Sequence, residues 1–293
     1  MVRAVVAVVL MACLLPATVS AWGAEAHRHV MARAIDLLPV ELRPFFDAHR
    51  EELILRVNDP DLWRVVGWDE NAHHFLDFGV EAYGQYPFKA LPREYDRAVE
   101  RFGVDRVKEY GLLPWRFAEM FGELRRAFEG IPRNAPFAAD NAVLFAAVAA
   151  HYIQDAHQPL HATVNYDGQQ TGQRGIHSRF ETQLFERFGS ALALKPASRA
   201  PMTSPRDTVF DVLLESYQLV PSLLEADKTA AGGRTNYDDR YYDAFFRNAR
   251  PLLERRLSES AAATAAMIAG AWTEAGRPAL RVPSGRRTGS AVR

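Results

Sequence analysis

The sequence predicts an all-α protein, built as a single-domain multi-helix bundle. Apolar residues recur mainly at the spacing of one helix face, and no long run alternates apolar and polar residues as a half-exposed strand would. Proline-containing breaks separate these segments, but none has the length or monotony of an interdomain linker. The chain has 293 residues, 48% of them hydrophobic, which is enough to bury a substantial core.

The first 21 residues have the pattern of an export signal. Arg3 provides a positive start, residues 4–15 form an apolar run, and Val19-Ser20-Ala21 is a small-residue cleavage site. We therefore expect a secreted or periplasmic protein whose mature chain begins at Trp22. The apolar run is shorter than the about 20 residues of a transmembrane helix, and no later segment is a better candidate. The mature chain should have no transmembrane segment.

An alternative for the start of the chain is lipidation at Cys13. Residues 10–13, Leu-Met-Ala-Cys, loosely match a lipoprotein cleavage box. Cys13 is the only cysteine, so cleavage before Trp22 would leave an exported chain without disulfides. Such a chain must gain its stability elsewhere, and a bound metal can supply part of it.

The helical domain is expected over residues 22–276. An Ala-rich terminal helix is predicted at 258–275, followed by a flexible basic tail rich in Gly and Pro at 277–293. We detect no internal repeat. Three apolar stripes at helical spacing are assigned to the core. They are Val30, Ala34, Ile35 and Leu38; Phe117, Phe121, Leu124 and Phe128; and Val209, Leu213, Tyr217 and Val220.

The overall charge gives no attraction for a polyanion. The 35 Lys and Arg residues nearly cancel the 36 Asp and Glu residues. This balance argues against nonspecific binding of long nucleic acid, although it does not exclude a nuclease.

The densest chemical signal is the segment from His151 to His161. On a helix, His151 and Asp155 lie four residues apart on one face and can converge on one metal. Pro159 should end that helix, so that His161 follows from the next turn. His157 lies about 240° around the helix from His151 and is assigned a structural or supporting role.

A second pair with the same spacing is His177 and Glu181. Imidazole and carboxylate groups without thiolate suit zinc in a hydrolytic site, although ligand type alone leaves manganese and iron open. One such pair is more often a structural salt link, but two pairs within 31 residues favour a metal site.

Further candidate ligands lie upstream. His27 follows the expected new terminus at Trp22, whose free α-amine, with a pKa of about 8, can bind a metal together with its own carbonyl oxygen. Asp59 and Asp61 supply carboxylates at a turn before a helix. His73 and His74 are adjacent and cannot face the same way, so at most one should be a ligand.

Taken in order, these motifs resemble one family. From Trp22 to about Phe188 the chain is similar to the superfamily of bacterial zinc-dependent phospholipases C and the single-strand-specific zinc nucleases of fungi and plants. The resemblance is carried by the processed Trp and the His soon after it, an Asp before a helix, the segment from His74 to Asp77, the block from His151 to His161, and the pair His177 and Glu181.

The resemblance implies three zinc ions in a cleft. Asp61, His74, His151 and Asp155 would hold the first ion, and His161, His177 and Glu181 the second. The amine and carbonyl of Trp22 with His27 would hold the third, which Asp155 bridges to the first. Asp59 competes with Asp61, and Asp61 is preferred because Arg64 completes an Asp-x-x-Arg pattern. Asp61 and Asp155 are accordingly the expected catalytic residues.

The expected reaction is hydrolysis of a phosphodiester by a zinc-held hydroxide. A phospholipase C-like activity is favoured because the acid after His177 is a Glu, residues 175–181 resemble the phospholipase pattern, and the loop before His177 is short. Trp22-Gly23 and Gln158-Pro159-Leu160 look more like the nucleases. The substrate is therefore expected to be a phospholipid or, alternatively, single-stranded nucleic acid, with no stable protein partner implied. A noncatalytic, zinc-stabilised binding protein is a third hypothesis.

Overall fold

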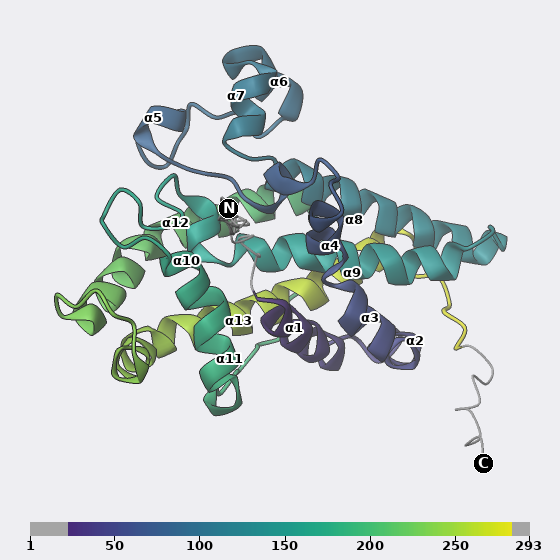
Figure 1. Cartoon of the computed structure of the whole chain (residues 1–293). Helices are drawn as coiled ribbons and strands as arrows, with labels where there is room; N and C mark the ends of the chain where they lie inside the picture. Colours follow the sequence, from purple (N-terminus) through teal and green to yellow (C-terminus); the bar gives the residue numbers. More distant parts are fainter. Residues whose placement is uncertain (1–22, 283–293) are drawn as a thin grey trace, which may run out of the picture.

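The computed structural model describes residues 23–282 (Figure 1). The expected export signal, Cys13 and Trp22 therefore lie outside the described residues, as do residues 283–293. Within the described part the prediction of an all-α fold is confirmed, because it contains helices and no β-strand; only one isolated bridge joins Phe78 and Thr163.

The helices follow one another along the chain with connections that range from a single residue, between α2 and α3, to residues 157–175, between α9 and α10. They are α1 (Ala24–Asp36), α2 (Arg43–Ala48), α3 (Arg50–Arg56), α4 (Asp59–Val65), α5 (Val80–Tyr83), α6 (Tyr95–Phe102), α7 (Val104–Glu109), α8 (Leu113–Gly130), α9 (Ala138–Ala156), α10 (Ile176–Ser178), α11 (Leu184–Phe188), α12 (Pro205–Ala231) and α13 (Asp239–Glu274). Short 3₁₀ turns η1 (Asn71–His74) and η3 (Pro159–Ala162) and a π-helical turn η4 (Arg179–Gln183) complete the parts that matter for the site.

The central element is α9. It contacts α1, α3, α8, α12 and α13, and its second half is buried at every residue from Ala146 to Ala156. Five alanines between Ala142 and Ala150 lack bulky side chains and so allow the neighbouring helices to approach closely. Figure 1 shows α8 and α9 side by side as a long hairpin, with α1 and α3 on one side of it. The C-terminal end of α9 therefore lies in the interior.

The predicted apolar stripes belong to the core. The stripe beginning at Val30 lies on α1 and just beyond it, the stripe beginning at Phe117 lies on α8, and the stripe beginning at Val209 lies on α12. All of their residues are buried except Tyr217, which is half-buried and packs against the same core.

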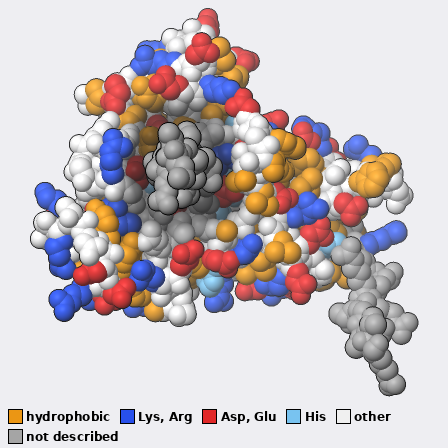
Figure 2. Space-filling model, viewed as in Figure 1, with side chains coloured by type: hydrophobic (Ala, Val, Ile, Leu, Met, Phe, Trp, Pro, Cys, Tyr) orange, Lys and Arg blue, Asp and Glu red, His pale blue; other side chains and the backbone are white. Residues whose placement is uncertain are grey.

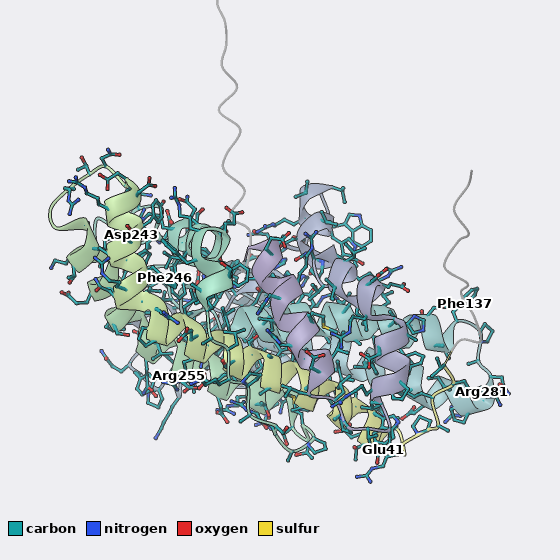
Figure 3. The ribbon with its side chains drawn as sticks, turned by 90° about the horizontal axis from the view of Figure 1, so that it is seen from below. Glu41, Phe137, Asp243, Phe246, Arg255 and Arg281 are labelled. Atoms are coloured by element: carbon teal, nitrogen blue, oxygen red, sulfur yellow. The ribbon has the colours of Figure 1, made fainter. Side chains whose placement is uncertain are left out.

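The terminal helix is longer than the sequence indicated. It begins at Asp239 rather than near Ser258, runs through Pro251 without ending, and starts with the Asp238 carboxylate accepting a hydrogen bond from the Tyr241 backbone N–H. Figure 3 shows Asp243 and Phe246 at one end of the molecule and Phe137 and Arg281 at the other, so that α13 runs along its length.

The first residues of the predicted tail lie against the domain. Pro278 is buried, its carbonyl accepts a hydrogen bond of 2.9 Å from Trp272 Nε1, and Leu280 packs against the core. At the opposite side of the fold, α5, α6 and α7 form a projecting lobe (Figure 1). Over residues 23–282, no helix has both the length and the apolar character required to cross a bilayer.

A close backbone approach at Gly270 tests this packing. A Cβ at that position would lie 2.2 Å from the Met202 carbonyl oxygen, in a segment tied to α13 by a hydrogen bond from Met202 N to Ala266 O. We expect Gly270→Ala to lower the free energy of unfolding by about 1–3 kcal/mol, as overpacking of a core does. Denaturant unfolding measures this change.

Gly122 on α8 is the matched control. A Cβ there would meet no atom closer than the end of the flexible Arg126 side chain, at 3.7 Å. Gly122→Ala should therefore raise stability by roughly 0.5–1 kcal/mol, the usual gain in a helix interior. A Gly270→Ala protein as stable as the parent would show that the Met202 segment does not pack as described.

Candidate metal centre

The site is built around the last turns of α9. His151 and Asp155 lie one turn apart on its buried face, with His151 Nε2 3.2 Å from Asp155 Oδ2, and both side chains are fully buried. The predicted convergence of these two residues is present. Because α9 crosses the interior, other helices can bring side chains to this face from several directions.

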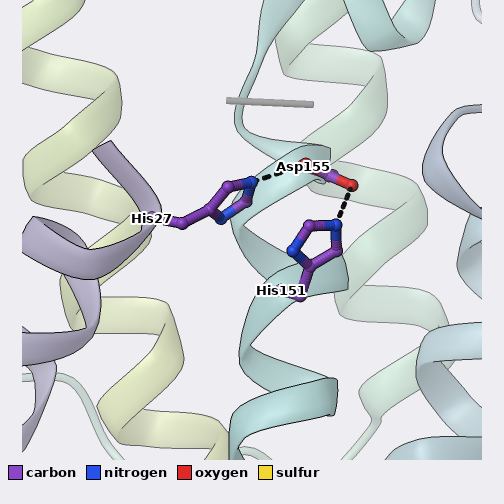
Figure 4. Close-up of side chains that lie close together, drawn as sticks. All are labelled: His27, His151 and Asp155. Atoms are coloured by element: carbon purple, nitrogen blue, oxygen red, sulfur yellow. Dashed lines mark ion pairs between the residues drawn. The ribbon is translucent and has the colours of Figure 1, made fainter. Parts of the chain in front are cut away.

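One of these side chains is His27, from the second turn of α1. Its Nε2 lies 3.3 Å from Asp155 Oδ1, and its ring stacks on that of His151 at 4.2 Å between centroids. Figure 4 shows His27 and His151 pointing toward the two oxygens of Asp155, each joined to a different oxygen by a dashed line. These three residues form one group whose donor atoms lie within 4.8 Å of one another. His27 on α1 is at least 124 positions along the chain from the two residues of α9.

A second group joins α4 and η1 to the same helix. His74 Nδ1 is 3.0 Å from both Asp155 Oδ2 and His151 Nε2, and 3.9 Å from Asp61 Oδ1. Asp61, His74 and His151 thus form a second group whose donor atoms lie within 4.8 Å of one another. Asp59, the competing candidate, pairs with Arg56 at 3.3 Å and belongs to none of the metal-binding groups among residues 23–282.

The third group lies beside the first two. After α9 ends, Pro159 begins η3, which carries His161, and the turn through α10 and η4 carries His177 and Glu181. His177 Nε2 is 3.0 Å from Glu181 Oε2 and 3.1 Å from His161 Nε2. His161 Nδ1 is also 3.8 Å from Asp155 Oδ1, so that this group is connected to the central carboxylate.

Four of the imidazoles are held by carbonyl oxygens behind them. The Nδ1 atoms of these rings lie within hydrogen-bond distance of a backbone or amide oxygen, so each Nδ1–H can donate outward and Nε2 faces the cluster, where its lone pair is available once the ring is neutral. The pairs are His27 with Gln154 Oε1 at 2.7 Å, His151 with Val57 O at 2.8 Å, His161 with His74 O at 2.7 Å and His177 with Tyr166 O at 2.9 Å. This arrangement is typical of metal-binding histidines.

The separations between the donor atoms match those expected around a bound metal ion. A tetrahedral zinc ion with bonds of about 2.0–2.1 Å keeps its ligand atoms about 3.3 Å apart, close to the separations of 3.0–3.6 Å in these groups. His27 Nε2 and Asp155 Oδ1 are buried and face each other at 3.3 Å, with no other hydrogen bond to either atom among the described residues. Since buried polar atoms are costly to leave incompletely paired, a bound cation gives a simple account of them. These buried groups can therefore hold metal.

The charges of the cluster are strongly coupled. Burial raises the pKa of the Asp155 carboxyl, but the neighbouring His151 and His161 outweigh burial and hold this pKa well below its usual range. Burial likewise lowers the pKa of His151, but the carboxylates of Asp155 and Asp61 raise it to about 9. A metal that binds here must displace the His151 proton, so that metal uptake releases protons.

His157 does not join the cluster. Its Nδ1 lies 2.7 Å from the Ile153 carbonyl, and its own carbonyl accepts a hydrogen bond of 2.9 Å from Arg256 Nε. Burial, with a contribution from the positive Arg256, lowers the pKa of the His157 imidazole well below its usual range. A neutral imidazole on the opposite face of α9 is the structural role that the helix geometry predicted.

Two of the three groups that could hold a metal ion reach a cleft of about 460 Å³. His74, His161 and His177 line it on one side. The remaining lining includes residues of α4, the segment after η1, the end of α7 and the loop before α10. Among them are Arg64, Phe75, Asp77, Tyr110 and Tyr166. A ligand in this cleft can reach the cluster directly.

The π-helical turn that holds Glu181 is supported by residues that the sequence did not single out. Arg179 Nη2 pairs with the buried Asp227 of α12 at 3.0 Å, and Arg179 Nη1 donates to the Arg174 carbonyl at 2.7 Å. The hydroxyl of Tyr241 on α13 also donates to Asp227. The sequence beyond Phe188 contains no motif that predicts this support. Asp227 and Tyr241 lie 48 and 62 positions from Arg179 and have no characteristic spacing.

Comparison with known proteins identifies no family for this chain. No protein-family model matches this chain, and no characterised protein matches its sequence at a significant level. The description of the site therefore depends on its geometry and chemistry alone.

Asp155 should matter more for metal binding than any other side chain. Its two oxygens face His27 and His151 respectively, and His74 and His161 also lie within 4 Å, so Asp155→Asn removes the charge shared by all the groups. We expect more than about 100-fold loss of metal affinity, beyond the 10–100-fold typical of a group that only supports a ligand. Metal content after dialysis, measured by atomic absorption, tests this.

His157→Ala is the matched control on the same helix. Because its imidazole faces away from the cluster, the folded variant should keep its metal, with circular dichroism verifying the fold. Metal loss equal to that of Asp155→Asn would mean that the ligand face of α9 has been misassigned.

Asp77 allows a test of the cleft by pH. Burial raises the pKa of its carboxyl well above the usual range, and Oδ1 has no hydrogen-bond partner among the described residues. In the unfolded chain the group ionises near its ordinary pKa of about 3.9, so it costs the fold stability as pH rises above that value. Asp77→Asn should therefore gain stability over the parent at neutral pH and lose this advantage toward pH 4.

Denaturant unfolding at the two pH values measures the difference. Asp69 is the control, because it is exposed and paired with Lys108, and burial does not penalise its charge. Asp69→Asn should bring no gain at neutral pH. If Asp77→Asn were less stable than the parent at neutral pH, the Asp77 carboxylate would have a stabilising partner in the cleft.

Proposed function

We propose that this protein is a zinc-dependent phosphodiester hydrolase of the phospholipase C type, belonging to the superfamily that the sequence resembles. The observation that carries the proposal is the meeting of His27, Asp61, His74, His151, Asp155, His161, His177 and Glu181 in buried groups beside a cleft. These residues come from α1, α4, η1, α9, η3, α10 and η4. Chance packing seldom gathers so many imidazoles and carboxylates in a core, because each costs free energy to bury.

In this proposal Asp61, His74, His151 and Asp155 hold one zinc ion, and His161, His177 and Glu181 hold another. A third is held by His27, Asp155 and the α-amine and carbonyl of Trp22. Trp22 lies outside the described residues, but its neighbour Gly23 packs against Thr182, next to Glu181. The first described residue, Gly23, thus lies beside the segment that carries Glu181.

Bound zinc supplies a water whose pKa is lowered to about 7 and positive charge for the phosphate oxygens. The chain's own residues position the reactants. Asp155 and Asp61, the catalytic residues of the proposal, bring negative charge and acceptor oxygens to His74, which lines the cleft. Arg64, 3.1 Å from Asp61, lines the same cleft and places a cation near an incoming phosphate. Asp77 also lines the cleft, and burial raises the pKa of its carboxyl well above the usual range, which favours a carboxyl group that can donate a hydrogen bond to a polar group of the substrate.

The lipid substrate is favoured by Glu181 and by the pattern of residues 175–181, which resemble the phospholipases. A single-strand-specific nuclease is the second candidate. It is favoured by the aromatic rings of Phe75, Tyr110 and Tyr166 in the cleft lining, since nucleotide bases stack on such rings.

One assay separates these candidates. The purified protein is stripped with a chelator, and hydrolysis of phosphatidylcholine, single-stranded DNA and a chromogenic phosphodiester is followed before and after zinc is returned. We expect no turnover without zinc, and restored hydrolysis of the chromogenic substrate and of phosphatidylcholine when zinc is present. Hydrolysis of DNA without hydrolysis of lipid would identify the nuclease. A protein that binds zinc and cleaves none of the three would be a noncatalytic zinc-stabilised binding protein.

A further inference from the structure

A row of apolar side chains is exposed on α4 and the turn after it. Leu62, Val65, Val66 and Trp68 are 56%, 64%, 71% and 62% exposed. Leu55 of α3 joins them, because it lines the same surface groove as Leu62 and Val65. These five residues are called the α4 patch below. Figure 2 shows hydrophobic side chains gathered over the position of α4 on the face seen in Figure 1. An apolar cluster of this kind marks an interaction surface.

The α4 patch lies at the edge of the cleft. The same helix carries Asp61 on its buried side, within 3.9 Å of His74. Arg64 lines both the groove beside the patch and the main cleft. A surface that contacted the α4 patch would therefore lie next to the opening that leads to the metal-binding groups.

The charges around the α4 patch cancel. Arg64 pairs with Asp61 at 3.1 Å, Arg56 pairs with Glu52 at 2.9 Å, and Lys108 pairs with Asp69 beside Trp68. Every one of these cations has a carboxylate partner, so the patch offers no excess positive charge to an anionic surface. Its charge balance matches a surface whose own charges cancel, such as a zwitterionic phospholipid headgroup layer.

The size and composition of the α4 patch favour a lipid surface over a second copy of this chain. A stable protein interface uses about 20–30 residues on each side, several times the five of this patch. Tryptophan at the end of an aliphatic cluster suits a membrane interface, where its ring contacts acyl chains while its N–H remains among polar groups. Trp68 is held in an exposed position by stacking on Trp63, at 5.4 Å between ring centroids.

We propose that the α4 patch is a membrane-docking surface, which seats the protein on zwitterionic phospholipid so that the cleft faces the headgroups. This inference rests on the proposed function, because it names the form in which the lipid substrate meets the site. Docking of this kind depends on apolar burial and should persist at high salt.

The test compares one pair of exposed substitutions with a single exposed control substitution, in the zinc-loaded protein. Val65→Ser with Val66→Ser removes apolar surface from the patch, and Val40→Ser, at a position 78% exposed outside the patch, is the control. Binding to phosphatidylcholine vesicles is followed within seconds of mixing by energy transfer from tryptophan to a dansyl-labelled lipid. Activity is measured on vesicles and on a soluble chromogenic phosphodiester, and circular dichroism verifies folding.

We expect the double variant to lose about tenfold in vesicle binding and in vesicle hydrolysis, since burial of each valine side chain contributes to partitioning. Its rate on the soluble substrate should equal that of the parent, because neither valine lines the main cleft. Val40→Ser should match the parent in every measurement, and binding should be the same at low and high salt.

Vesicle binding that is equal in the double variant and the parent would overturn the proposal. So would binding that requires anionic lipid and disappears at high salt, or a parent dimer in gel filtration that the double variant converts to monomer. The proposed function fails separately: a protein that docks on vesicles through the patch but cleaves neither lipid nor the soluble phosphodiester would retain this surface and lose the hydrolase assignment.

Discussion

The structure depends on one buried carboxylate. Asp155 is fully buried in the middle of the helical bundle, where an isolated negative charge would cost several kcal/mol. Four imidazoles approach its two oxygens within 4 Å, and they come from α1, η1, α9 and η3. The packing of these elements around α9 is therefore fixed by the same contacts that create the metal-binding groups. Removing the negative charge of Asp155 would therefore disturb both the packing around α9 and the groups that could hold a metal ion.

The support around the cluster explains how its imidazoles are held. The Val57 carbonyl, at the end of α3, and the His74 carbonyl, in η1, receive hydrogen bonds from rings that belong to α9 and η3. The rings of His151 and His161 are thus each held by a carbonyl oxygen from another segment of the chain. Because α9 is rich in alanine where these elements meet it, the backbones come close enough for such short contacts.

The second half of the chain has a supporting role that its sequence did not reveal. Asp227 on α12 and Tyr241 on α13 hold Arg179, which belongs to the π-helical turn between His177 and α11. A π-helical turn is an uncommon backbone form that neighbouring contacts must maintain. Here the buried ion pair between Arg179 and Asp227 maintains it, so that Glu181 keeps its place beside His161. Long helices that carry no ligand therefore still determine the site.

The sequence by itself determined the helical fold, the core stripes and the pairing of His151 with Asp155 and of His177 with Glu181, because helix periodicity places residues four apart on one face. It left Asp59 and Asp61 as competitors, placed the start of the last helix near Ser258 instead of Asp239, and did not indicate a role for Asp227. Only the tertiary structure brought His27 to Asp155 across 128 positions and turned Asp61 rather than Asp59 toward His74. Local spacing cannot encode such contacts, since they follow from how whole helices pack around α9. The same packing decided which apolar residues of α4 stay at the surface while Asp61 on that helix is buried.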